Sequence, residues 1–496
     1  MKKFHELDIP HSGFYAEGAG ATFFVVFTRE ELYKVVSFAE RHGFKLFSWQ
    51  FPNMTQELAQ ELLPECPKEE LPITRNKNDE EEKLPVYIDF SHPRAKELLA
   101  AQWKDRMDAG IRGSMVDFGD VVPDEAVFYD GRRGDEMHNA YAYQYAKNYR
   151  ELFEQKYGDD HVLYTRGAAP GSQHFACQFG GDQLTSFQGL KYAIAGGLSA
   201  AASGLPFWGV DAGGYDGFPD QETYLRWTEY AAFCPLMRFH GTEPREPWEY
   251  DAFTVKVYRY YTWLRENLRP YIVSVAAEAH KLGIPMMRPL AMMYPEDQEA
   301  TKVWDEYLFG EDLLVAPVSD ETEEREIYFP EGRWISLWNL NDEISGPVQR
   351  SVEVPIDKIP VYIREGSFLP LRLNESLKLG ESMSESETEM ILAVVPQNDS
   401  IVKETLYERS GAKTCCGMEK NGETIQLQIS GRTAELYVML AGIHWKNTEA
   451  IVNGRTLTKV TAREGLYFTE GYLELEEGIL VKINPSAESV IKIQKK

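Results

Sequence analysis

Cysteine is scarce in this chain: five of 496 residues are Cys, and none of them stands in a CxxC pair or at a metal-ligand spacing. Such a small, odd number is typical of reduced thiols and predicts a cytoplasmic protein. No apolar run is long enough for a transmembrane helix, and the first residues lack the apolar core of a secretory signal. Basic residues are outnumbered, 52 against 78 acidic ones, for a net charge of −26. This charge argues against nucleic acid and anionic membranes as partners.

Apolar residues, in contrast, are plentiful. Hydrophobic residues make up 43% of the chain and aromatic ones 12%, which is enough for a large buried core. The length exceeds that of one ordinary domain, so two or three domains are expected. A β/α barrel of about 250 residues would fit within it.

Strand-like and helix-like segments alternate from about residue 23 to about residue 300. A strand at 23–27 precedes a helix that begins at Thr28, with Glu31 completing a capping box, and 44–49 is the next strand. Asp89 is predicted to cap a helix that ends near residue 110. Such alternation predicts a parallel sheet with helical crossovers. Further strands are expected at 113–116, 162–165, 204–211 and 235–238, with long helices at 188–203 and 255–282.

The pattern changes near residue 300, where short strands separated by turn residues replace the alternation. Strands are predicted at 307–318, 326–329, 333–338, 361–364, 424–429 and 434–439. We therefore expect a catalytic (β/α)8-type barrel at 1–300, a proximal β domain at 301–374 and a distal β domain at 375–496. The fold class is α/β: a TIM-type barrel followed by two all-β, sandwich-like domains.

Two acidic residues lie where strands of such a barrel should end. Asp117 follows the small and apolar residues 113–116, and Asp182 follows the glycine-rich 179–181. Side chains at the carboxyl ends of barrel strands form the active site. Two carboxylates presented by different strands suit cleavage of a glycosidic bond.

The segments around these residues resemble glycoside hydrolase family 31, the retaining α-glycosidases, and they follow in family order. Residues 117–120 (DFGD) resemble the nucleophile segment, and 164–166 (YTR) with 179–182 (FGGD) resemble the acid/base segment. Residues 208–214 (WGVDAGG) and 237–241 (MRFHG) resemble substrate-binding segments. Residues 314–318, 330–334 and 360–364 resemble the β domain that follows the barrel in this family.

The resemblance implies a role for each residue. Asp117 is expected to be the nucleophile, and Asp182 the general acid and then the general base. A double displacement requires their carboxyl groups to lie roughly 5–5.5 Å apart. It also requires the pKa of Asp182 to be raised while Asp117 stays ionised. Substrate binding is assigned to Arg166, Asp211, Arg238 and His240, to the apolar walls Trp208, Phe118 and Phe179, and to Glu17, which falls where relatives have a substrate-binding aspartate.

Each role has a structural alternative. Asp117 could cap a helix or turn, and Asp182 could serve only its Gly-Gly-Asp turn. Asp211, followed by Ala-Gly-Gly, suits an Asx-type turn. His240 could be a hydrogen-bonded core histidine, and Arg166 a structural ion-pair partner of either aspartate.

The sequence also departs from the usual family pattern. The family's N-terminal β-sandwich and first barrel strand have no counterpart in the sequence, so we expect a shortened barrel, and an unclosed barrel is a reason to expect a homo-oligomer. The predicted function is hydrolysis of small α-glycosides, with α-glucosides as the expected substrates. The alternative is a catalytically silent relative that binds sugar or assembles with a partner subunit. Retaining hydrolysis by two carboxylates calls for no cofactor.

Overall fold

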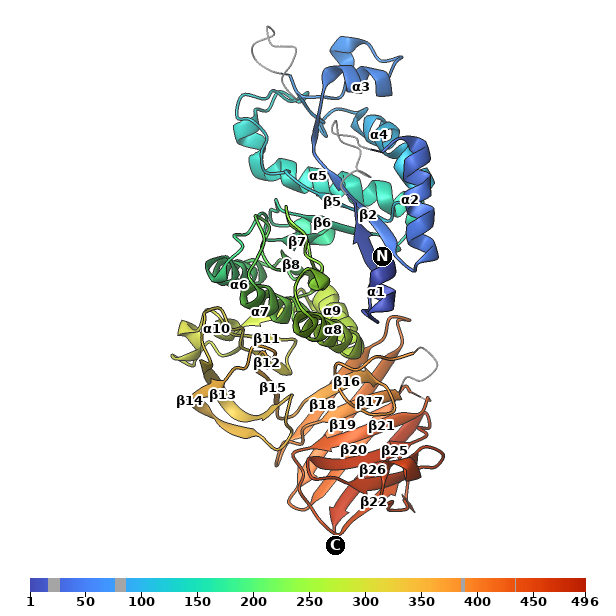
Figure 1. The fold of residues 1–496 in the computed structure, drawn as a ribbon, viewed down its shortest axis with the longest axis vertical. Coiled ribbons are helices and arrows are strands. Elements are labelled where there is room, and N and C mark those ends of the chain that lie inside the picture. Colours follow the sequence, from blue (N-terminus) through green and yellow to red (C-terminus); the bar gives the residue numbers. More distant parts are fainter. Residues whose placement is uncertain (17–26, 76–85, 385–388, 433) are drawn as a thin grey trace. The chain divides into compact units, whose positions relative to one another are not determined.

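The computed structural model describes residues 1–16, 27–75, 86–384, 389–432 and 434–496 (Figure 1). The chain forms two compact units. The first contains Met1–Gly181 and Ser203–Gly209, and the second contains Asp182–Ala202 and Val210–Lys496. The chain thus leaves the first unit at Gly181, immediately before the predicted acid/base residue.

A parallel β-sheet forms the centre of the first unit. Its order is β1-β2-β5-β6-β7-β8, and every neighbouring pair is parallel. Helices connect β1 to β2, β2 to β5 and β5 to β6, as parallel pairing requires. The strands are β1 (Gly13–Tyr15), β2 (Lys45–Gln50), β5 (Gly113–Val116), β6 (Val162–Thr165), β7 (Cys177–Phe179) and β8 (Trp208–Asp211). The α-helices of this unit are α1 (Lys2–Glu6), α2 (Arg29–Arg41), α3 (Gln56–Leu62), α4 (Ala95–Ala109) and α5 (Gly134–Tyr157).

Strand β8 ends in the second unit, where β9 (Leu236–Arg238) follows it in the strand order. Seven strands of the barrel sheet therefore lie in the described residues. The predicted strand at 23–27 falls almost entirely outside the described residues.

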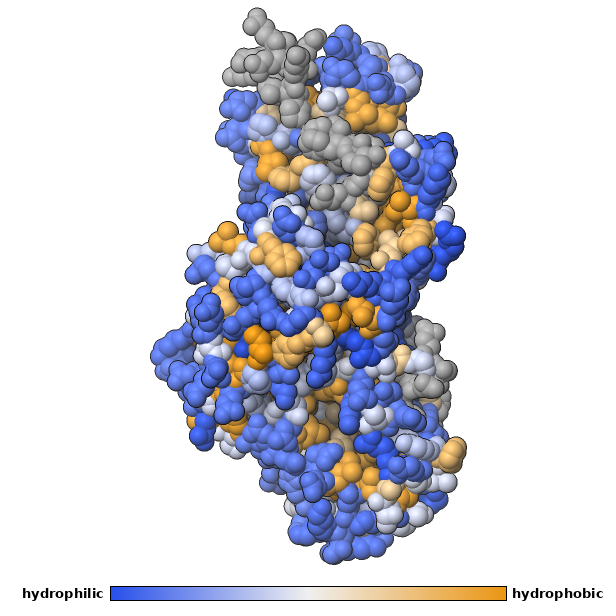
Figure 2. Space-filling model, in the orientation of Figure 1, coloured by the Kyte–Doolittle hydropathy of each residue, from blue (hydrophilic) through white to orange (hydrophobic). Residues whose placement is uncertain are grey.

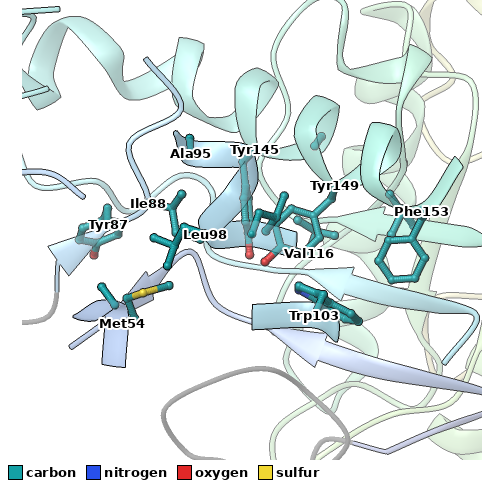
Figure 3. Close-up of a cluster of buried hydrophobic side chains, with 14 of the residues drawn as sticks. Met54, Tyr87, Ile88, Ala95, Leu98, Trp103, Val116, Tyr145, Tyr149 and Phe153 are labelled. Carbon is teal, nitrogen blue, oxygen red and sulfur yellow. The ribbon is translucent and has the colours of Figure 1, made fainter. Parts of the chain in front are cut away.

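Helix α5 supplies much of the core of the first unit (Figure 3). The hydroxyl of its residue Tyr145 donates to the carbonyl of Gln50, at the end of β2, across 3.1 Å. Trp103 of α4 packs edge-on against two rings of α5, at centroid distances of 5.8 and 5.0 Å. Four aromatic residues at i, i+4 spacing line the buried face of α5: Tyr141, Tyr145, Tyr149 and Phe153. This packing fixes the strand ends from which the site is built.

Two helix-start predictions had different outcomes. The capping box of α2 is confirmed: Thr28 N donates to Glu31 Oε2 across 2.8 Å, and Glu31 N donates back to Thr28 Oγ1 across 3.3 Å. The prediction that Asp89 caps a helix is wrong. Helix α4 begins at Ala95 after an N-cap residue, Arg94, that makes no side-chain cap. Asp89 instead accepts from the backbone N–H of Tyr129 across 2.6 Å, so it closes a loop.

The second unit contains α6 (Phe187–Ala202), α7 (Gln221–Ala232), α8 (Ala252–Asn267) and α9 (Arg269–Leu282). The single helix predicted at 255–282 is in fact two helices that meet at Leu268. Pro270 lies in the first turn of α9, where its missing N–H is tolerated, but it could not continue α8. The remaining short helix, α10, spans Leu290–Met293.

The rest of the second unit is all-β, as predicted. One six-stranded sheet has the order β10-β11-β12-β15-β13-β14, and the strands predicted at 326–329 and 333–338 are parts of one long strand, β13. Its strands are β10 (Met287–Pro289), β11 (Tyr307–Phe309), β12 (Leu313–Val315), β13 (Glu324–Ser336), β14 (Glu343–Glu353) and β15 (Val361–Arg364). The predicted domain boundaries near residues 300 and 374 stay predictions.

Two further sheets share one apolar core and form a sandwich. The five-stranded sheet contains β16 (Phe368–Leu373), β17 (Glu389–Val394), β21 (Leu436–Ala441), β25 (Gly478–Ile483) and β24 (Gly471–Glu474). The six-stranded sheet contains β18 (Ile401–Tyr407), β19 (Lys413–Asn421), β20 (Thr424–Ser430), β26 (Glu488–Lys495), β22 (Thr448–Val452) and β23 (Arg455–Thr456).

Hydrophilic residues cover most of the face shown in Figure 2, and hydrophobic ones are scattered among them. Single exposed hydrophobic side chains are ordinary on protein surfaces. Within the described ranges, no helix combines the length and the hydropathy that crossing a membrane would need.

Candidate active site

Asp117 follows directly on β5 and is buried, with 4% of its surface exposed. Its Oδ2 accepts a hydrogen bond from Trp49 Nε1 across 3.0 Å, and its Oδ1 accepts from the backbone N–H of Phe118 across 2.9 Å. Its own N–H donates to the carbonyl of Gln50 across 3.0 Å. The carboxylate therefore has a single orientation, fixed from two neighbouring strand ends.

Arg166 supplies positive charge beside this carboxylate. It follows β6, and its Nε lies 3.6 Å from Asp117 Oδ1 and 3.8 Å from Asp120 Oδ1. Its guanidinium carbon stands 4.0 Å from the centroid of the Phe118 ring, which is a cation–π arrangement. Arg166 thus forms an ion pair with Asp117, one of the two aspartates with which the sequence predicts a pairing, and a second one with Asp120.

Arg166 also packs against the turn that leads to Asp182. A Cβ on Gly181 would lie 2.8 Å from Arg166 Cδ, and Gly181 has a φ of +72°. Only glycine suits this conformation and this close approach. A glycine immediately before Asp182 is therefore required by the fold, whatever Asp182 itself does.

Phe118 has a φ of +57°, a left-handed conformation that bulky residues rarely adopt. Strain of this kind concentrates at functional sites. Its ring lies 4.5 Å from the ring of Phe51 and 6.3 Å from that of Trp49, so three aromatic side chains form a wall beside Asp117. Trp49 and Phe51 are not among the residues predicted from the sequence, although their place at the end of a predicted strand was a usable signal.

Three further residues of the first unit were predicted to bind the sugar. Phe179 ends β7 and is buried, with its ring 6.0 Å from that of Tyr164. Trp208 is the first residue of β8, so it stands at the amino end of the strand whose carboxyl end is Asp211. Glu17 lies outside the described residues.

In the second unit, Asp211 and Arg238 form a buried ion pair at the ends of β8 and β9. The backbone N–H of Asp211 donates to Gln183 Oε1 across 3.3 Å, which ties the strand end to the segment after Asp182. Asp182 itself is exposed. Asp211 begins a turn, because its carbonyl accepts from the N–H of Gly214 across 2.8 Å, and its side chain is buried against a cation.

His240 lies two residues after Arg238. Burial, helped by the charges of Arg238 and Arg245, lowers the pKa of His240 to about 3, so the ring is neutral over the ordinary pH range. The ring of Tyr215 lies 5.4 Å from it. Tyr215 and Arg245 are not among the residues predicted from the sequence, because nothing local in the sequence marks either residue.

No group of three or more His, Cys, Asp or Glu side chains in the described part of the chain has an arrangement that could hold a metal ion.

The model of the glycosyl hydrolases family 31 TIM-barrel domain matches residues 1–275, and that of the glycosyl hydrolase family 31 C-terminal domain matches residues 283–369. The chain belongs to glycosyl hydrolase family 31. The resemblance seen in the sequence is therefore confirmed, and so is the fold class. Residues beyond 369 fall outside both family 31 matches.

Several family 31 relatives match more than half of this chain. An isomaltosyltransferase of Sporosarcina globispora is 31% identical over 430 residues, which cover 82% of this chain and 39% of the relative. An α-xylosidase of Emericella nidulans is 32% identical over 294 residues, which cover 57% of this chain and 38% of the relative. A sulfoquinovosidase of Escherichia coli is 32% identical over 297 residues, covering 56% and 43%. The chain thus spans less than half the length of these relatives.

Solved family 31 structures share the whole fold. The cycloalternan-forming enzyme of Listeria monocytogenes, solved with a pentasaccharide substrate, matches with a TM-score of 0.88 at 22% identity, covering all of this chain and 52% of that one. A dextranase of Flavobacterium johnsoniae in complex with glucose gives a TM-score of 0.88 at 22% identity, and the match covers 100% of this chain and 68% of the dextranase chain. At this level of identity the likeness establishes the fold alone.

Proposed function

We propose that this chain is a retaining α-glycoside hydrolase that acts on small α-glycosides, with α-glucosides as the expected substrates. The observation that supports this most directly is the carboxylate of Asp117. It is held at a strand end by a Trp49 hydrogen bond of 3.0 Å and stands beside the guanidinium of Arg166. A carboxylate that is oriented and charge-paired in this way suits attack on an anomeric carbon.

In the first step, an oxygen of Asp117 bonds to the anomeric carbon as the bond to the leaving oxygen breaks. Asp182 donates its proton to that oxygen, and the aglycone leaves as an alcohol. In the second step, Asp182 takes a proton from water, which attacks the anomeric carbon and releases Asp117. The exposure of Asp182 supports this role, because water must reach the group that activates it.

The buried pair Asp211–Arg238 would bind sugar hydroxyls, since it stands at the carboxyl ends of β8 and β9, where barrel enzymes hold their substrates. His240, kept neutral by its surroundings, can both donate to and accept from a hydroxyl. The ring of Phe118 would face the apolar side of the sugar. Relatives that act on α-xylosides and sulfoquinovosides show that this scaffold supports several sugars.

The test is release of nitrophenol from p-nitrophenyl α-glucoside, α-xyloside, α-galactoside and α-sulfoquinovoside. Turnover of one glycoside by the wild type, lost in a folded Asp117→Ala variant, is the expected result. Absence of turnover on every glycoside, by protein with a native circular dichroism spectrum, would instead favour the silent relative that binds sugar or assembles with a partner.

A further inference from the structure

Arg245 has an unusual set of partners for a buried charged residue. Its surface is 6% exposed, and the five N–H groups of its guanidinium make six hydrogen-bond contacts, all with backbone carbonyls. Among the described residues it forms no salt bridge. The acceptors, with their distances, are Gly214 (3.1 and 2.8 Å), Tyr215 (3.1 Å), Gly217 (2.6 Å), Glu243 (2.9 Å) and Pro244 (3.2 Å). The planar guanidinium thus hydrogen-bonds to two loops at once.

These two loops are the ones that follow β8 and β9, and the guanidinium packs directly on their backbones. A Cβ on Gly241 would lie 2.5 Å from Arg245 Nη2 and 2.6 Å from Cζ. A Cβ on Gly213 would lie 3.3 Å from both Cδ and Nε of Arg245. The guanidinium therefore has room only because both neighbours are glycines.

The same two loops are also bonded to each other. The backbone N–H of Thr242 donates to the carbonyl of Tyr215 across 2.8 Å, and its Oγ1 accepts from Gly217 N across 2.9 Å. Gly213, Gly214 and Gly217 have φ values of +93°, +79° and +80°, so the loop after β8 has no regular structure of its own. Its conformation depends on these cross-links.

We infer that Arg245 is a positioning residue, which locks the loop after β8 to the loop after β9 so that Asp211, Tyr215 and His240 form one sugar-binding surface. Asp211 ends β8 and His240 follows β9, so each loop carries part of that surface. Tyr215, whose carbonyl accepts from Arg245, places its ring 5.4 Å from that of His240. The sugar-binding part of this inference rests on the proposed function.

Arg265 is a matched control. It also lies in the second unit, burial likewise lowers its pKa, and its guanidinium donates to three carbonyls: Ala232 (3.0 Å), Cys234 (2.7 Å) and Pro235 (2.6 Å). These carbonyls precede β9, whereas those bound by Arg245 follow β8 and β9. The barrel's active-site face is the carboxyl end of its strands, so Arg265 serves the opposite end.

The variants are Arg245→Met, Arg245→Lys, Arg245→Ala, Gly241→Ala and Arg265→Met. Gly241→Ala adds a methyl group where the guanidinium lies, so it should push the guanidinium out of place while Arg245 itself is unchanged. It also serves as the test if Arg245→Met does not fold. The first measurement is hydrogen–deuterium exchange, which needs no turnover. Faster exchange in both 212–217 and 239–244 is expected in the Arg245 and Gly241 variants, and normal exchange there in Arg265→Met.

The second measurement is the kinetics of p-nitrophenyl α-glucoside hydrolysis, or of whichever glycoside the wild type cleaves. KM should rise about tenfold or more in the Arg245 and Gly241 variants with a smaller change in kcat, since binding contacts are lost. Low concentrations of guanidinium chloride should partly restore KM in an Arg245→Ala variant only. Equal effects of Arg245→Met and Arg265→Met on exchange and on KM would overturn the inference. If the wild type cleaves no glycoside, the proposed function fails, and the exchange comparison alone decides whether Arg245 locks the two loops.

Discussion

The indole Nε1 of Trp49 lies 3.0 Å from Oδ2 of Asp117, although 68 positions separate the two residues in the chain. They meet because β2 and β5 are adjacent parallel strands, with Trp49 in register with Met115. Parallel neighbours bring their carboxyl ends to one edge, so a donor on one strand can orient an acid at the end of the next. The orientation of the proposed nucleophile is therefore decided by strand pairing.

Replacing Trp49 by Phe should lower kcat by about tenfold to a hundredfold, because a hydrogen bond to a charged group contributes roughly 1.5–3 kcal/mol. The ring is kept, so the unfolding temperature should change little. Trp103→Phe is the control: Trp103 is fully buried in the same unit and packs on Tyr149 and Phe153. This variant should unfold at a lower temperature with an unchanged kcat. Similar losses of kcat in both variants would argue against the role of the Trp49 hydrogen bond.

Replacing Asp182 by Ala should remove the general base that the second step needs, so the glycosyl-enzyme accumulates. Azide needs no base, and its addition should restore turnover of an aryl α-glycoside with a good leaving group and yield an α-glycosyl azide of retained configuration. Chromatography and NMR of the product check this. In Asp117→Ala, azide can only displace the leaving group directly, which would give the inverted β-azide. If azide did not change the rate of Asp182→Ala, Asp182 would not be the acid/base residue.

His240 should make stability depend on pH. Its folded pKa is lowered to about 3, below the ordinary 6.5, so the unfolded chain binds a proton that the folded chain does not. The free energy of unfolding should therefore fall as pH decreases from about 6.5 towards 3, by at most about 1.4 kcal/mol per pH unit from this group. His240→Gln should show a shallower dependence in urea titrations between pH 6.5 and pH 4. Parallel curves for the two proteins would contradict the prediction.

Asp312 should change the pH dependence of stability in the opposite direction, so that the folded protein becomes less stable as pH rises. Burial, with the neighbouring charge of Glu311, raises its pKa from 3.8 to about 6, although contacts with Ser367 and Tyr271 favour ionisation. Between pH 3.8 and 6 the unfolded chain loses a proton that the folded chain keeps, so stability falls as pH rises through this window. Asp312→Asn should remove this loss of stability, because an amide does not ionise. Its unfolding temperature relative to wild type should be higher at pH 7 than at pH 4, and a constant difference would rule out the raised pKa.

Several local elements could be read from the sequence because their causes are local. The capping box of α2 needs only Thr28 and Glu31, and β5 needs only a short run of small and apolar residues. The place of Asp117 at a strand end follows from that run. The boundary between α8 and α9 was also readable, since Pro270 marks it, but the apolar pattern on both sides of it favoured one helix.

The amino-acid sequence by itself determined the family, the change from α/β to all-β near residue 300 and the identity of the candidate acids. Tertiary structure alone decided what surrounds them. Trp49 faces Asp117 only through strand pairing, Asp211 is buried only by its pairing with Arg238, and Arg245 reaches two loops only after both have folded. Hydrogen bonds and ion pairs act over a few ångströms in space, and a sequence records separation along the chain, so such partners emerge only when the strands are paired.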